Sequence, residues 1–204
     1  MSSARTGLVS RRSGKGEYIE TETGNKISRR SHIEGKQNIM LAGKSVIMAD
    51  VVLRGDLCRR QEKPGEEDKA VNITAISIGK ATVIATGCTI RPPMRLSRGQ
   101  MVYYPMRIGD NVFIGPGTHV SSVSISSHVH IGEGCVLMPF SVIKDSCQLL
   151  PHTVVPPHMV IPPGSVVGGS PARVLGDVPE GWGQTASDDW VEGGDLRGLV
   201  RTIK

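Results

Sequence analysis

Aliphatic residues recur at every sixth position over most of this chain of 204 residues. An α-helix repeats its apolar residues about every 3.6 positions and a half-exposed strand every second position, so neither element sustains a period of six. The aliphatic positions are Ile78, Ile84 and Ile90, then Ile108, Ile114, Val120, Ile125, Ile131, Leu137, Ile143, Leu149, Val155, Ile161 and Val167, with one step of five residues before Ile125. Repeats of six residues are typical of a parallel β-helix, in which each repeat forms one side of a coil.

A second position supports this register. The residue four places after each aliphatic is mostly small or β-branched: Thr82, Cys88, Val112, Thr118, Val129, Cys135, Ser141, Cys147, Thr153, Met159 and Ser165. Glycine often follows the aliphatic directly, and we interpret it as a corner residue that adopts unusual backbone angles at low cost. Three repeats then make one triangular coil, and coils stack as parallel strands about 4.8 Å apart. The sequence therefore predicts an all-β fold, a left-handed parallel β-helix shaped as a triangular prism, whose narrow interior suits the 3% aromatic content.

The ends of the chain follow the repeat less closely. Residues 17–176 are expected to form the β-helix, with coils from about Ile27 to Asp56 and from about Ile76 to Val167. Ile27, Ile33 and Ile39 keep the period, and Val46 and Val52 continue it in a shifted register. Residues 1–16 are basic and free of acids, which favours a disordered tail over a mitochondrial transit peptide.

The C-terminal residues 177–204 are expected to form a tail with a short helix at about 188–203. Leu196, Leu199, Val200 and Ile203 fall on one face of that helix. This face either folds back on the prism or docks a partner.

The composition bounds the class of protein. No long apolar run suggests a membrane span. Three of the four cysteines occupy the small-residue position, which favours small buried side chains over a metal site or a disulfide. Free cysteines in turn indicate a reducing, intracellular compartment. The net charge of +5 is not accompanied by interleaved aromatic residues, so nucleic-acid binding is not expected.

Two segments interrupt the repeat and are expected to be irregular loops. Residues 57–75 contain a run of mixed charge at 59–69, which predicts a mobile surface loop. Residues 92–105 are rich in apolar side chains and should pack on a prism face or contact a partner. The candidate partner-binding residues at this second loop are Arg91, Pro92, Pro93, Met101, Tyr103 and Tyr104.

Enzymes built on the same repeat offer an alternative function. Residues 169–173, Gly-Ser-Pro-Ala-Arg, are similar to the segment that ends the coil in acyltransferases and γ-class carbonic anhydrases. Such a carbonic anhydrase needs three histidines that converge on zinc, two of them five residues apart, and no pair of the six histidines has this spacing. An acyltransferase needs a histidine base on a projecting loop, and neither interrupting loop contains one. We therefore predict no catalytic residue, no metal and no cofactor.

More specific motifs then carry a resemblance. Residues 17–29, Glu-Tyr-Ile-Glu-Thr-Glu-Thr-Gly-Asn-Lys-Ile-Ser-Arg, resemble the N-terminal segment of the dynactin subunit 5 family, as do residues 37–57. Ile90-Arg91-Pro92-Pro93, a loop, and then Ile-Gly-Asp-Asn-Val-Phe-Ile at 108–114 are also similar to that family. The resemblance covers residues 17–167 and departs from the family at the insertion 59–69, in the basic tail and after Gly176.

This resemblance implies a non-catalytic subunit of dynactin, the activator of the microtubule motor dynein, with a place in the dynactin pointed-end complex. The implied partners are dynactin subunit 6, itself a left-handed β-helix, dynactin subunit 4, the pointed-end actin-related protein and dynein cargo adaptors. The implied location is the cytoplasm and the microtubule cytoskeleton, with a link to early endosomes. An exposed coil at one end of a β-helix also invites a second β-helix to stack on it.

Overall fold

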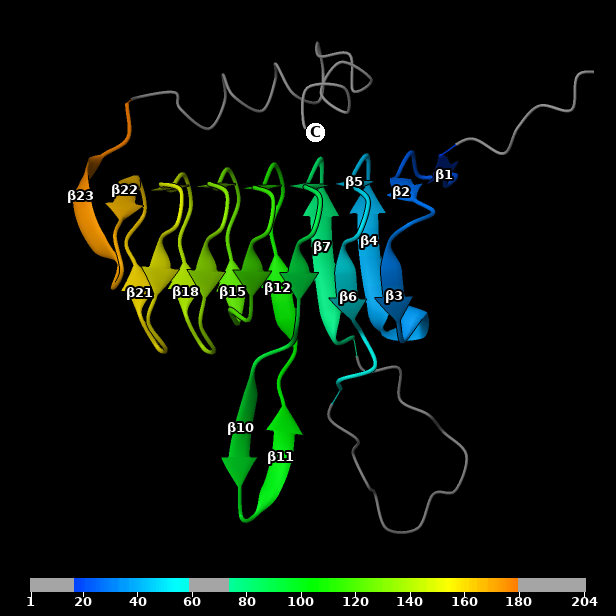
Figure 1. Cartoon of the computed structure of the whole chain (residues 1–204), viewed down its shortest axis with the longest axis horizontal. Coiled ribbons are helices and arrows are strands. Elements are labelled where there is room, and N and C mark those ends of the chain that lie inside the picture. The colour runs from blue at the N-terminus through cyan, green and yellow to red at the C-terminus, as the bar shows by residue number, and fades with distance from the viewer. Residues whose placement is uncertain (1–16, 59–73, 180–204) are drawn as a thin grey trace, which may run out of the picture.

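The computed structural model describes residues 17–58 and 74–179, and its strands stack in three sheets around a triangular prism (Figure 1). The first sheet has nine strands: β1 (Tyr18–Glu20), β2 (Lys26–Ser28), β5 (Val46–Ile47), β8 (Val83–Ile84), β13 (Phe113–Ile114), β16 (His130–Ile131), β19 (Gln148–Leu149), β22 (Ser165–Gly168) and β23 (Arg173–Asp177). The second has six: β3 (His32–Glu34), β6 (Val52–Arg54), β9 (Thr89–Ile90), β14 (His119–Val120), β17 (Val136–Leu137) and β20 (Val154–Val155). The third also has six: β4 (Ile39–Gly43), β7 (Ile76–Lys80), β12 (Met106–Ile108), β15 (Ser124–Ile125), β18 (Val142–Ile143) and β21 (Val160–Ile161).

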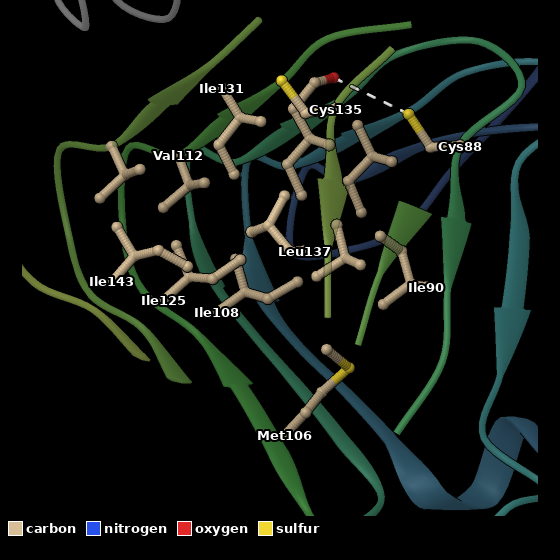
Figure 2. Close-up of a cluster of buried hydrophobic side chains, with 14 of the residues drawn as sticks. Cys88, Ile90, Met106, Ile108, Val112, Ile125, Ile131, Cys135, Leu137 and Ile143 are labelled. Atoms are coloured by element: carbon tan, nitrogen blue, oxygen red, sulfur yellow. Dashed lines mark hydrogen bonds between the residues drawn. The ribbon is translucent and has the colours of Figure 1, made fainter. Parts of the chain in front are cut away.

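The predicted ladder is the core of this prism. Ile114 pairs with Ile131, Ile131 with Leu149 and Leu149 with Val167, all in parallel strands of the first sheet. These side chains are fully buried, and Figure 2 shows the ladder residues of neighbouring coils converging on the interior. Because one aliphatic fills each side of each coil, the interior is a continuous apolar column, as the period of six predicts.

The N-terminal register differs from the prediction. Ile47 and Leu53 occupy the column, where Val46 and Val52 were expected, because Ile47 pairs with Ile84 and Leu53 with Ile90. Val46 instead points outward and joins a second buried cluster on the outer face of the first sheet. That cluster contains Val46, Met48, Val83 and Ala85, with Tyr18 and Phe113 packed against it.

The role assigned to glycine after the aliphatic is also corrected. Gly79, Gly109, Gly115 and Gly132 do not adopt positive φ angles, but a Cβ on any of them would meet main-chain atoms of the next coil at 2.7 Å or less. Close approach of coils therefore requires these glycines. The left-handed backbone lies further along each repeat, mostly at residues other than glycine, for example at His128 (φ 58°).

The small-residue position supplies hydrogen-bond donors between coils. The Thr82 hydroxyl donates to the Gly109 carbonyl over 2.9 Å, and the Cys88 thiol donates to the Gly115 carbonyl over 3.1 Å. Cys135 and Cys147 likewise donate to carbonyls of the following coil. The three cysteines are buried, as predicted, and burial raises the pKa of each thiol. They are packing residues whose S–H groups satisfy main-chain oxygens.

The second interruption is a hairpin and not an irregular loop. β10 (Met94–Ser97) and β11 (Gln100–Tyr103) pair in an antiparallel sheet of two strands, which projects from one corner of the prism (Figure 1). A single turn of 3₁₀-helix, η1 (Lys36–Asn38), precedes β4. The charged run 59–69, the tail 1–16 and the expected helix at 188–203 lie outside the described residues. Within the described residues, no helix is long and apolar enough to cross a membrane.

Candidate interaction surfaces

An aromatic contact fixes the base of the hairpin to the prism. Tyr104 packs edge-on against Phe140, with ring centroids 5.3 Å apart, and Phe140 stacks on His158 one coil further on. At the other strand of the base, the Tyr104 main-chain N–H donates to the Pro93 carbonyl over 2.9 Å. The hairpin therefore leaves the prism at a fixed point.

Arg54 of β6 is held by acids beside the hairpin base. Its guanidinium donates to both carboxylate oxygens of Asp56, over 2.8 and 2.7 Å, and Glu34 lies 3.2 Å from its Nε. The hydrogen bonds from Arg54 hold the pKa of Asp56 below its usual value. These acids are thus already paired, and they leave the arginines of the hairpin without a partner from this cluster.

The six sequence-predicted partner-binding residues separate into two groups. Pro92 and Pro93 are buried, and the Pro93 carbonyl accepts a hydrogen bond from the Tyr104 main-chain N–H over 2.9 Å. Arg91 is half-buried, and its Nη2 lies 3.0 Å from the Met94 sulfur. These three residues form the base. Met101 is exposed on the hairpin, and Tyr103 and Tyr104 are half-buried where it meets the prism.

Sequence reasoning missed Phe140 and His158 as neighbours of the hairpin. They are 18 residues apart, which is one coil, so they occupy the same corner in successive coils. Both adopt positive φ angles, of 64° and 60°. The coil length of 18 residues could have shown that Phe140 and His158 stack, because residues one coil apart lie next to each other. It could not have shown that the hairpin reaches them.

The two ends of the prism differ. At the N-terminal end the inward aliphatic side chains remain partly exposed: Ile27, Ile33, Ile39 and Leu41. β3 and β4 end their sheets there and pair with one strand each among the described residues. This end presents two uncovered strand edges around an open apolar core.

The C-terminal end is closed by the chain itself. β23 folds back antiparallel on β22, and Ala172, which is fully buried, donates its N–H to the Val154 carbonyl over 2.8 Å. Val155, Ile161 and Val167, the last residues of the column, have no exposed surface. β20 and β21 end their sheets here among the described residues. The turn at residues 169–172 bonds to β20, since the Val154 N–H also donates to the Gly169 carbonyl over 3.0 Å, whereas β21 pairs with one strand.

Three of the six histidines, His130, His152 and His158, lie against neighbouring coils, whereas His32 and His119 are exposed. His130 stacks on Phe113, with ring centroids 5.0 Å apart, and burial lowers its pKa. His152 lies over Gly134, where an added Cβ would approach its ring to 2.5 Å. No group of three His, Cys, Asp or Glu side chains in residues 17–58 and 74–179 is placed to bind a metal.

Comparison with protein families gives one match that covers most of the chain. The family model for dynactin subunit 5 matches residues 8–65 and 66–189. A protein of Dictyostelium discoideum named dynactin subunit 5 is 37% identical over 113 residues, which are 55% of this chain and 49% of that protein. An uncharacterized protein of the same organism is 28% identical over 178 residues, covering 85% of this chain and 71% of that protein. The chain thus spans about half the length of the first of these relatives.

Solved structures support the fold. A putative acetyltransferase of Bacillus cereus superposes with a TM-score of 0.60 at 20% identity, covering 88% of this chain and 94% of that chain. A hexapeptide transferase family protein of Anaplasma phagocytophilum gives 0.56 at 17% identity, covering 89% and 94%. At these identities the likeness shows the fold alone, and it confirms the predicted left-handed β-helix.

Proposed function

The chain belongs to the dynactin subunit 5 family, and from that premise we propose that it is a non-catalytic scaffold subunit of the dynactin pointed-end complex. In this role it links dynein and dynactin to cargo such as early endosomes. Its partners there are dynactin subunit 6, dynactin subunit 4, the pointed-end actin-related protein and dynein cargo adaptors, at the microtubule cytoskeleton of the cytoplasm.

The open N-terminal end of the prism carries this proposal. An uncovered strand edge is a template for further strand pairing. The half-exposed side chains of Ile33 and Leu41 would be sealed by the first coil of another β-helix, which burial of apolar area favours. We therefore assign the N-terminal end as the surface on which dynactin subunit 6 stacks.

Two matched variants test the assignment. Met40 on β4 and Val160 on β21 point outward from the edge strands of the same sheet at opposite ends, and they are 58% and 56% exposed. We expect Met40→Asp, alone or with Leu41→Asp, to reduce co-purification with subunit 6 while the free protein keeps its fold by circular dichroism. Val160→Asp should leave co-purification unchanged.

A cellular experiment tests the wider role. Deleting the chain should leave motor assembly largely intact and reduce the motility of early endosomes. The proposal is wrong if the chain co-purifies with no dynactin subunit. It is also wrong if endosome transport is normal without the chain. Loss of binding in Val160→Asp with normal binding in Met40→Asp would reverse the assignment of the ends.

A further inference from the structure

The hairpin β10–β11 has one apolar face that extends beyond the prism. Met94 pairs with Tyr103 and Leu96 with Met101, and residues paired or two apart share a face of a sheet. Met94 and Tyr103 are half-buried at the base, while Leu96 and Met101 are 66% and 53% exposed. A short two-stranded hairpin is a marginal structure by itself, so its fixed base holds this exposed face in place.

The turn determines which main-chain groups point outward. Arg98 and Gly99 both have positive φ angles, of 49° and 77°, as a two-residue turn of type I′ requires. Ser97 and Gln100 beside this turn then form a hydrogen-bonded pair, and every second pair is bonded in the same way. The bond from the Tyr104 N–H to the Pro93 carbonyl fits this alternation. Leu96 belongs to a non-bonded pair, so its N–H and C=O point outward along the edge of β10.

The charge of the segment is of one sign. Residues 91–107 contain four arginines and no acid. Three of the arginines, at positions 91, 95 and 98, lie before, on and just after β10, whereas β11 carries none. The edge of β10 is therefore the basic edge of the hairpin.

We propose that the edge of β10 binds an extended acidic segment of a partner protein, which adds a third strand to the hairpin. The main-chain groups of Leu96 pair with this strand. Its apolar side chains cover the face formed by Met94, Leu96, Met101 and Tyr103, and its acids meet Arg95 and Arg98. This inference rests on the proposed scaffold function only for the identity of the natural partner.

A synthetic peptide tests the proposal on the chain alone, without dynactin subunits. The probe alternates glutamate and valine and carries a fluorophore, and its binding is followed by fluorescence anisotropy. We expect Leu96→Asn and Arg95→Glu each to weaken binding by about tenfold or more, which corresponds to about 1.4 kcal/mol. The control Lys144→Glu makes the same charge change at an exposed site elsewhere on the prism and should leave binding unchanged.

Two further readouts separate strand addition from attraction of charges. The Leu96 amide should exchange more slowly with solvent when the peptide is bound, while the Arg95 amide, which faces β11, should not change. A peptide with proline at alternate positions cannot pair and should not bind.

Several results would overturn the proposal. One is that a lysine–valine peptide binds as tightly as the glutamate–valine peptide. Another is that Lys144→Glu weakens binding as much as Arg95→Glu does. A third is that the bound peptide does not slow exchange of the Leu96 amide. Binding of the chain to vesicles of phosphatidylcholine and phosphatidylserine, lost in Leu96→Asn while the peptide does not bind, would assign the hairpin to membranes instead. The peptide assay does not depend on dynactin subunits, so its failure is distinct from failure to co-purify with them.

Discussion

Replacing Gly115 with alanine should destabilise the prism because two coils approach too closely there for a side chain. A Cβ at this position would lie 2.5 Å from the Gly132 carbonyl carbon, 2.6 Å from the Glu133 nitrogen and 2.7 Å from the Gly132 oxygen. Carbon atoms in contact are normally about 3.5–4.0 Å apart, so the coils must separate locally by about 1 Å. Because all three atoms are main-chain atoms, no side chain can rotate away to make room.

The cost can be worked from this displacement. Overpacking in a well-packed interior costs about 1–3 kcal/mol. The displacement also lengthens the adjacent hydrogen bond from the Gly115 N–H to the Ile131 carbonyl, now 2.8 Å, and weakening one such bond costs about 0.5–1.5 kcal/mol. We expect Gly115→Ala to lower the free energy of unfolding by about 3 kcal/mol. For a domain of this size that lowers Tm by about 6–12 °C.

Two other glycines serve as controls in the same thermal and urea unfolding assays. Gly117 has a φ of 66° and open space around it, so Gly117→Ala should cost about 1–2 kcal/mol and Gly117→Asn less, since asparagine tolerates this conformation. Gly176 has neither a positive φ nor a close neighbour, and Gly176→Ala should change stability by less than about 0.5 kcal/mol.

The outcome that would refute the reasoning is specific. If Gly115→Asn were as stable as the parent while Gly115→Ala were not, backbone conformation and not close approach would be the requirement. If Gly115→Ala and Gly176→Ala had the same Tm, the two coils at Gly115 would be far enough apart to accept a Cβ.

Other expectations follow from the core and the hairpin base. Ile131→Asp places an unpaired charge where the side chain has no exposed surface and should cost several kcal/mol in urea unfolding, measured against Val160→Asp on the outer face. Burial raises the pKa of Cys88 to about 11, so its thiol should resist alkylation in the folded protein. Its contribution to stability should be lost as pH rises from about 9 to 11, so the fall in stability over that range should be smaller in Cys88→Ala, and a fall as large as in the parent would contradict this. Burial lowers the pKa of His130, so its contribution is present above about pH 6.5 and is lost as pH falls, and His130→Gln should flatten the acid limb of the stability curve. Phe140→Ala should speed amide exchange at Tyr104, and unchanged exchange would show that the ring contact does not hold the hairpin.

The sequence predicts the column well because the interior of a closed prism accepts only aliphatic side chains. Ile114, Ile131 and Leu149 each had to face inward once the period was recognised. The N-terminal register was not predictable in the same way, because Val46 and Ile47 are adjacent aliphatics and both are buried. Only the pairing of Ile47 with Ile84 shows which of them faces the column.

The candidate surfaces were predictable only in part. Apolar content correctly marked 92–105 as more than a solvated loop, but arginine occupies the turn position where asparagine, aspartate or glycine would have signalled a hairpin. Pro92 and Pro93 were named as candidate partner-binding residues, and the structure buries both at the base of the hairpin. The contact between Tyr104 and Phe140 depends on where the hairpin rejoins the prism, which no local pattern specifies.

The unequal ends of the prism also limit how far stacking can proceed. A subunit with matching open ends could add copies indefinitely and grow into a filament, as head-to-tail contacts that do not close are known to do. Here, in the described part of the chain, the turn through Ala172 and strand β23 occupies the positions that a following coil would need. If a neighbour stacks at the N-terminal end as proposed, a second one at the other end would have to displace this turn or pair with β21 alone. The proposed stack would therefore extend from one end of this subunit more readily than from the other.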